Sequence, residues 1–236
     1  MAPLKILVLG HSHITALAKA FHRGEPGVSM DFVLLNNPEY QPPLSDEGLH
    51  PAILEKIHAA RAGLHVSLLG GNDHSIIGML NHPRRFDFVL PEAPDLPVDE
   101  TAEILPAGLL LAHLAQRVAP HLAVLALYRA AVPGRLVHVE SPPPIPSEAH
   151  IRAHPGVFRE MIEERGVSPA LLRYKLWRLH SELYARECAR IGVEFLPAPE
   201  AMRDEQGMMR PEAWNPDPTH GNALYGRHVI GSLLAA

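Results

Sequence analysis

Cysteine is almost absent from this sequence, since the 236 residues include only Cys188. One thiol cannot form an internal disulfide, and without a cysteine cluster the chain has no thiolate zinc site. Basic residues are also too few to create a positive surface, because 21 Lys and Arg stand against 26 Asp and Glu. With a formal net charge of −5, we expect no nucleic-acid partner, because no basic stripe is available to neutralise phosphates.

Long uninterrupted apolar runs are missing as well. The most apolar segment, 105–131, contains prolines, arginines, a glutamine and histidines, so we expect a core helix, broken near Pro120, and no membrane span. The N-terminus lacks the features of a secretory signal, because Lys5 lies within an apolar run that stops at Gly10. The resulting expectation is a cytoplasmic protein.

Short apolar runs alternate with helix-like segments along the whole chain. This alternation predicts a parallel sheet with helices on both faces, and five strands of this kind usually take the order 2-1-3-4-5. The expected strands are 5–9, 32–35, 66–69, 136–140 and 193–196, and the expected helices are about 14–21, 51–62, 102–131, 169–191 and 223–233. Proline-rich insertions are expected after strand three, at 75–101 with a short strand at 86–90, and after strand four, at 142–166.

Polar residues follow the first and third strands at the point where each strand ends. Strand one runs into Gly10-His11-Ser12-His13, and strand three runs into Gly70-Gly71-Asn72-Asp73-His74. Taken alone, Ser12 is explained as the N-cap of the next helix. In the order 2-1-3-4-5, however, strands one and three are neighbours, and ligands bind above their carboxyl ends. The topology therefore predicts that Ser12 and Asn72 face one another.

A histidine and an aspartate lie three positions apart just before the last helix. Asp217 and His220 on one turn can place a carboxylate against one imidazole nitrogen and leave the other nitrogen free. That pair suits a serine nucleophile, with His220 as base and Asp217 holding its tautomer. The Asn72 side chain and the backbone N–H of Ser12 would donate hydrogen bonds to the developing oxyanion.

These motifs resemble those of the SGNH hydrolases, also called GDSL-type esterases and lipases. The resemblance implies a flavodoxin-like three-layer α/β/α fold over a single domain, 1–236. It also implies Ser12 as nucleophile, His220 as base, Asp217 as its partner and Asn72 as an oxyanion donor. The blocks that carry it are Gly10-His11-Ser12, Gly70-Gly71-Asn72-Asp73 and Asp217-x-x-His220-Gly221-Asn222, in the family's order.

Two positions depart from the family's pattern. The family commonly has an acidic residue directly before the serine, where this chain has His11, a residue that could add positive charge beside the nucleophile. The family also has a glycine after strand two as a further oxyanion donor, and the first glycine in that loop here is Gly48. We assign Gly48 to the oxyanion hole on that basis. Substrate-binding roles are assigned to the polar residues around the motifs, namely His11, His13, Asp73 and His74.

The resulting prediction is a serine esterase that hydrolyses an acyl ester, O-acetyl esters included, through an acyl-enzyme. The substrate would be a small-molecule or glycan ester, and no cofactor or metal is expected. Activity would require neutral His220 and be lost as that base takes up a proton. Three alternatives stay open: a metal-dependent phosphoesterase using the histidine-rich motifs, an acyltransferase, and a non-catalytic binding domain of the same fold.

Overall fold

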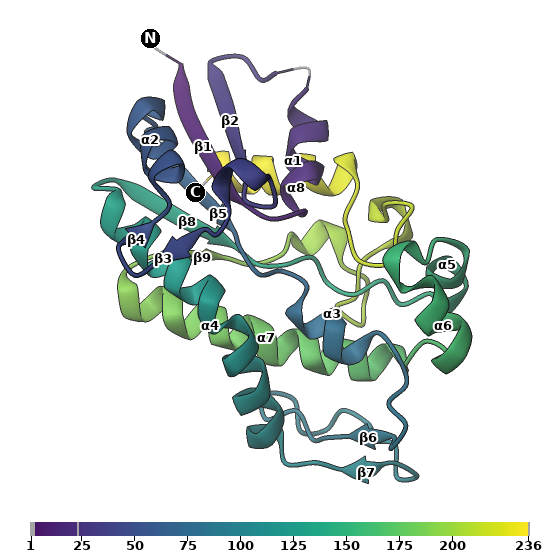
Figure 1. Ribbon diagram of the computed structural model, residues 1–236. Coiled ribbons are helices and arrows are strands. Elements are labelled where there is room, and N and C mark those ends of the chain that lie inside the picture. Colours follow the sequence, from purple (N-terminus) through teal and green to yellow (C-terminus); the bar gives the residue numbers. More distant parts are fainter. Residues whose placement is uncertain (1–2, 23, 236) are drawn as a thin grey trace.

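A five-stranded parallel sheet forms the centre of the protein. The computed structural model describes residues 3–22 and 24–235, and the strand order is β2-β1-β5-β8-β9 (Figure 1). All four neighbouring pairs are parallel, which confirms the predicted order 2-1-3-4-5. The strands are β1 (Leu4–Gly10), β2 (Val28–Leu34), β5 (Leu64–Leu68), β8 (Arg135–Val139) and β9 (Glu194–Leu196).

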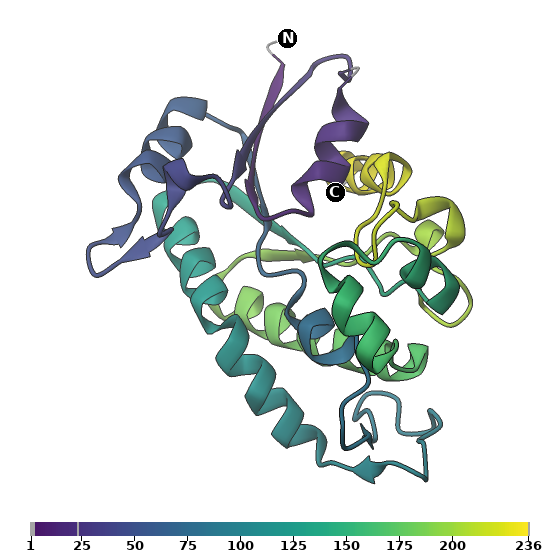
Figure 2. The ribbon, with the colours of Figure 1, turned by 45° about the vertical axis from the view of Figure 1, so that its right-hand side comes forward.

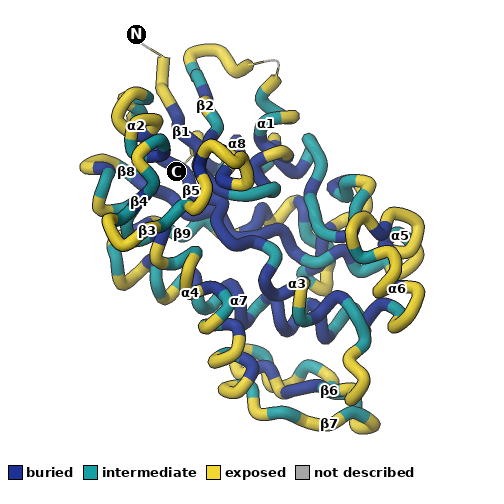
Figure 3. The backbone as a smooth tube through the Cα atoms, in the orientation of Figure 1, coloured by how far each residue is buried: buried dark blue, intermediate teal, exposed yellow. Residues whose placement is uncertain are grey.

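Helices cover both faces of this sheet (Figure 2). Successive side chains of a strand point to opposite faces, so in β1 Ile6 and Val8 pack with helices α1 and α8, whereas Leu7 and Leu9 pack with α2, α4 and α7. The strand is therefore buried on both faces, as its continuous apolar run indicates (Figure 3). The five helices are α1 (Ile14–Phe21), α2 (Pro51–Ala60), α4 (Ala107–Ala131), α7 (Ala170–Ile191) and α8 (Ala223–Ala235).

Helix α4 continues through Pro120, so the predicted break at this residue is wrong. Proline removes one helical donor and crowds the carbonyl of Gln116, but both residues are exposed, and that carbonyl can bond water. The flanking turns are held by buried residues such as Leu114 and Val124. Among the described helices, α4 alone has the length and composition of a bilayer-crossing helix; here it packs against the sheet and α7.

The first insertion packs on α4 and α7 beyond the edge of the sheet. Phe88 and Leu90 are buried in a separate cluster with residues of both helices. Lys175 of α7 anchors the insertion, because its buried ammonium lies 2.9 Å from the Asp87 carboxylate and also bonds backbone carbonyls. The predicted strand at 86–90 is wrong beyond Asp87, since pairing stops there. The elements of this region are α3 (Asp73–Gly78), β6 (Phe86–Asp87) and β7 (Glu103–Ile104).

The second insertion is helical rather than irregular. Ser147 caps its first helix by accepting a hydrogen bond from the His150 N–H at 3.1 Å. The insertion contains α5 (Glu148–Ala153), η2 (Gly156–Phe158) and α6 (Arg159–Arg165). The remaining short elements are η1 (Pro38–Tyr40), β3 (Leu44–Ser45), β4 (Gly48–Leu49), η3 (Glu200–Met202) and η4 (Pro211–Ala213).

Close packing of α1 against α8 depends on one glycine. A Cβ atom on Gly226 would lie 2.1 Å from the carbonyl oxygen of Ala16, whereas a Cβ on Gly231 of the same helix would meet nothing within 4 Å. We expect Gly226→Ala to lower the free energy of unfolding by about 3 kcal/mol, because backbone atoms must move apart. Gly231→Ala is the matched control and should raise it by roughly 0.5–1 kcal/mol through helix propensity. Urea unfolding of both variants measures this, and equal effects would contradict the packing described.

Candidate active site

Ser12 is the second residue beyond the end of β1. A Cβ at Gly10 would lie 2.3 Å from the carbonyl oxygen of Leu68, so only glycine lets β1 and β5 approach here. The N–H of His11 donates to the same carbonyl at 3.0 Å, and the chain leaves the sheet at Ser12. The serine side chain does not cap α1, which has no side-chain cap. Its hydroxyl is therefore available at the carboxyl edge of the sheet.

The Ser12 hydroxyl is hydrogen-bonded to a histidine brought from the far end of the chain. Ser12 Oγ lies 2.7 Å from His220 Nε2, and His220 Nδ1 lies 3.0 Å from Asp217 Oδ1. An ionised carboxylate only accepts hydrogen bonds, so this contact places the imidazole proton on Nδ1. The lone pair of Nε2 then faces the serine hydroxyl, as a general base requires.

The turn that carries His220 is built around the Asp217 carboxylate. Its Oδ1 accepts backbone N–H groups from Thr219 at 2.9 Å and His220 at 2.8 Å, a turn typical of aspartate. Its Oδ2 accepts the Asn215 amide at 2.5 Å. Burial opposes ionisation of Asp217, but the hydrogen bonds from His220, Asn215 and Thr219 outweigh it and lower its pKa below the usual value. The carboxylate is therefore ionised at neutral pH.

Asn215 and Asn222 help to build the loop that carries His220. The sequence patterns did not predict that Asn215 bonds Asp217 or that Asn222 caps α8. Asn222 caps α8 by accepting the N–H groups of Leu224 at 2.8 Å and Tyr225 at 3.2 Å. Asp217 does not cap this helix and is left to hold His220. An asparagine before an apolar helical pattern is a recognisable cap signal, whereas the Asn215 contact depends on the folded loop.

Asn72 contacts the residue that follows Ser12. It is the N-cap of α3, and its side-chain Oδ1 lies 3.2 Å from His13 Nε2. Its amide nitrogen has no hydrogen-bond partner among residues 3–22 and 24–235, and the backbone N–H of Ser12 has no backbone acceptor there. Both donors are available to an oxyanion. Gly71 lets the His13 ring lie close to the backbone before Asn72, because a Cβ at Gly71 would lie 2.3 Å from that ring.

Neither histidine beside Ser12 adds positive charge. His11 Nδ1 accepts the Gly70 N–H at 3.2 Å, and its ring packs edge-on against His121. Burial, followed by His121, lowers the pKa of His11 to about 4. Burial, followed by His220, lowers the pKa of His13 to about 3. The expectation of a cationic His11 is wrong, because both rings are neutral at physiological pH.

The other residues assigned to substrate binding face the protein. His13 and His74 are buried. His74 contacts Ser75 at 3.3 Å, and its ring packs at a tilt against His180. Asp73 is also buried and points towards α4, where Arg117 and His121 lie 3.7 and 3.4 Å from its carboxylate oxygens. Of the four, only His11 is partly exposed. A direct substrate contact by the buried three is not supported.

Gly48 is not brought to this site. It pairs with Ser45 in the β3–β4 hairpin, which lies against α4, and no hydrogen bond among the described residues links Gly48 to Ser12, Asn72 or His220. Its φ of +117° serves the hairpin. The backbone beside Ser12 comes instead from the end of β2, where the Leu35 N–H donates to the Gly10 carbonyl at 2.8 Å.

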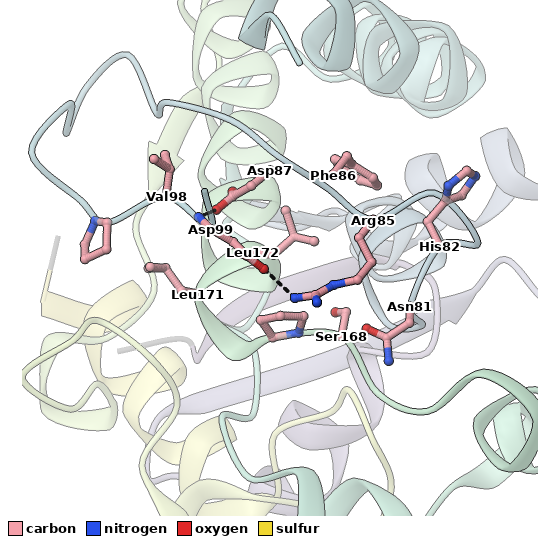
Figure 4. A pocket seen from close by; sticks show the side chains of 12 residues that line it. Asn81, His82, Arg85, Phe86, Asp87, Val98, Asp99, Ser168, Leu171 and Leu172 are labelled. Carbon is pink, nitrogen blue, oxygen red and sulfur yellow. Dashed lines mark hydrogen bonds and ion pairs between the residues drawn. The ribbon is translucent and has the colours of Figure 1, made fainter. Parts of the chain in front are cut away.

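The second insertion is hydrogen-bonded to the loop that carries His220. His150 Nε2 of α5 lies 3.0 Å from the Asn215 carbonyl and 3.2 Å from the Asp217 carbonyl. The first insertion instead encloses a cavity of about 260 Å³ against the start of α7 (Figure 4). Arg85 and Asp99 form an ion pair across that cavity, and neither Ser12, Asn72, Asp217 nor His220 lines it.

Sequence comparison and structural comparison give different answers. No protein-family model matches the sequence, and no curated protein matches it significantly. Among solved structures, a protein assigned as an acylhydrolase from Bacteroides fragilis is 11% identical and aligns over 100% of this chain and 88% of its own, with a TM-score of 0.50.

Two further solved structures cover nearly the whole chain. A protein assigned as an SGNH hydrolase from Slackia heliotrinireducens is 13% identical over 99% of this chain and 98% of its own, with a TM-score of 0.46. A carbohydrate acetylesterase from Sinorhizobium meliloti is 14% identical over 98% of each chain, with a TM-score of 0.47. Identities this low bear on the fold alone. The chain has a three-layer α/β/α fold with the strand order 2-1-3-4-5, which is the fold that the resemblance to the SGNH or GDSL-type hydrolases implied.

Proposed function

We propose that this protein is a serine esterase that hydrolyses acyl esters through an acyl-enzyme. The observation that carries the proposal is the unbroken hydrogen-bond chain from Ser12 Oγ through His220 to the Asp217 carboxylate, with distances of 2.7 and 3.0 Å. The same arrangement of nucleophile, base and orienting carboxylate recurs on unrelated serine-hydrolase folds, where geometry rather than chain order defines it.

In the proposed reaction, Ser12 Oγ attacks the ester carbonyl carbon while its proton moves to His220 Nε2. The tetrahedral intermediate collapses when the carbon–oxygen bond to the alcohol breaks, and His220 returns the proton to that leaving oxygen. Water then attacks the acyl-enzyme and gives a proton to His220. The bond between the acyl carbon and Ser12 Oγ breaks as His220 returns that proton to Oγ, which releases the acid and restores neutral His220 and free Ser12. Asp217 stays ionised throughout and stabilises the imidazolium that forms.

Two hydrogen-bond donors would stabilise the oxyanion of each tetrahedral intermediate. They are the backbone N–H of Ser12 and the amide nitrogen of Asn72, both without partners among the described residues. Because such donors are fixed before the reaction begins, each is typically worth about 3 kcal/mol of barrier.

The proposed substrate is an ester of a short acyl group, O-acetyl included, on a small molecule or glycan. The enclosed cavities beside the site are too small for a long acyl chain. One cavity lies beneath Gly71 and another beside Thr219, and each offers only about 10 Å³ to a water-sized group. A long acyl chain would have to lie along the surface instead.

The phosphoesterase alternative finds little support in the side chains present. Among residues 3–22 and 24–235, no group of three or more His, Cys, Asp or Glu side chains is placed to hold a metal ion. The histidine-rich motifs are instead used internally, since Nδ1 of His11 accepts a backbone N–H and His13 contacts Asn72. An acyltransferase would use the same Ser12 and differ only in which acceptor reaches the acyl-enzyme.

Replacing the nucleophile tests the proposal directly. We expect Ser12→Ala to lower kcat for p-nitrophenyl acetate by at least about a thousandfold and to abolish labelling by a fluorophosphonate, with unchanged thermal stability. Ser45→Ala, on the exposed β3 hairpin, is the control and should keep both. If a chelator abolished turnover while the fluorophosphonate failed to label Ser12, the serine mechanism would be wrong. An acyl acceptor that diverts product from the acid would instead favour transfer.

On the acid side of the pH profile, kcat/KM should depend on the uptake of one proton. His11 and His13, with pKa values lowered to about 4 and 3 by burial, stay neutral above pH 5, and the lowered pKa of Asp217 keeps it ionised. The proposed mechanism needs one neutral base, so protonation of that base should make log(kcat/KM) decline with unit slope as the pH falls. Stopped-flow or steady-state rates from pH 8 down to pH 5 measure this. A flat profile, or a slope near two, would contradict the assignment.

A further inference from the structure

A small enclosed cavity lies directly beneath Gly71. It is lined by residues from four parts of the fold: α1 with the loop before it, the end of β5, the chain after β8, and α8. The space open to the centre of a water molecule is about 10 Å³, which is about the volume that one water needs.

Three side chains that line this cavity each carry a buried polar atom with no hydrogen-bond partner among the described residues. These atoms are His13 Nδ1, Ser141 Oγ and Tyr225 Oη. Their residues are only 4%, 8% and 2% exposed. Buried polar atoms are rarely left unbonded, because the lost hydration costs about 1–3 kcal/mol for each.

The fourth polar side chain of the cavity is already bonded elsewhere. Glu140 accepts the Ala198 N–H at 2.8 Å and lies 3.3 Å from the Arg178 guanidinium. The remaining lining is apolar or backbone. The three unbonded atoms are therefore what the cavity offers to a ligand, and a neutral molecule with both donors and acceptors suits them.

We propose that this cavity binds one water molecule, held by His13, Ser141 and Tyr225, and that this water positions Asn72 for catalysis by fixing the tautomer of His13. The water donates one hydrogen to His13 Nδ1. It accepts the Tyr225 hydroxyl hydrogen, and the Ser141 hydroxyl completes its hydrogen bonds. Three polar partners are the usual number for a buried water.

The water acts on Asn72 through the imidazole ring of His13. His13 is buried and neutral, so its imidazole carries one N–H. With Nδ1 accepting from the water, that hydrogen is on Nε2 and donates to Asn72 Oδ1 at 3.2 Å. The Asn72 amide then presents its nitrogen, not its oxygen, to the oxyanion. If the hydrogen of His13 were on Nδ1 instead, the lone pair of Nε2 would face a lone pair of Asn72 Oδ1. That repulsion would favour a rotated Asn72 amide, with its nitrogen towards His13 and its oxygen towards the oxyanion.

The role of His13 is that of a positioning residue, and the inference rests on the proposed esterase function. Its ring also packs against His220, with centroids 4.6 Å apart. A purely structural role for the cavity would change stability alone. A positioning role must change kcat, because the Asn72 donor is needed most in the transition state.

The test combines structure, tautomer and rate. A high-resolution crystal structure of the full chain should show one water within hydrogen-bond distance of all three atoms, and ¹⁵N NMR should show His13 protonated on Nε2. Tyr225→Phe should lower kcat about tenfold with KM unchanged, because a misplaced catalytic group typically costs about 10- to 100-fold. In an Asn72→Ala background it should lower kcat no further.

Tyr128→Phe is the matched control. It removes another buried tyrosine hydroxyl, 3.1 Å from His65 and inside the opposite core, and should leave kcat unchanged. A dry cavity, an Nδ1 proton on His13, or equal kcat in Tyr225→Phe and wild type would overturn the inference. If Ser12 proved inert while the water and the tautomer were as expected, the proposed function would fail and the water site would stand.

Discussion

The parallel pairing of β1 with β5 is the constraint on which the site depends. Gly10 faces the Leu68 carbonyl so closely that any side chain would separate the strands. The pairing places the carboxyl ends of both strands side by side, and the chain turns away from the sheet at Ser12 on one strand and Gly70 on the other. His13, the residue after Ser12, contacts Asn72 because of it, with His13 Nε2 3.2 Å from Asn72 Oδ1. His220 then reaches Ser12 from the loop before α8, which packs on the same face as α1.

Burial, more than charge, sets the chemistry beneath this edge. The motifs carry four histidines near Ser12 and Asn72, counting His11, His13, His74 and His220, and burial lowers the pKa of the first three. They therefore act as neutral hydrogen-bonding rings. The charged partner of the site is Asp217, whose carboxylate is held ionised by the groups that donate to it. In the proposed reaction one imidazole changes charge while its neighbours do not.

Much of the fold was predictable from the sequence because each buried strand is a short apolar run between turn residues. The order of the strands followed from the alternation, and the neighbouring positions of the two strands that lead to Ser12 and Asn72 followed from the order. Sequence patterns did not predict the features that depend on tertiary contacts. Pro120 did not break α4, because packing on both sides holds the helix and the affected carbonyl is exposed. Gly48 was assigned to the oxyanion hole because it is the first glycine after strand two. It lies instead in the β3–β4 hairpin, which the sequence pattern did not predict. Burial of His13 and His74 could not be foreseen, since a polar residue after a strand is usually exposed.

The claim at the centre of this account is that Ser12 becomes covalently acylated. Rapid-quench kinetics with p-nitrophenyl acetate, followed by peptide mass spectrometry, tests it most directly. We expect a burst of one p-nitrophenol per protein molecule before steady state, with one acetyl group on the peptide that contains Ser12. Steady turnover without a burst, together with an unmodified Ser12 peptide at every quench time, would contradict the account.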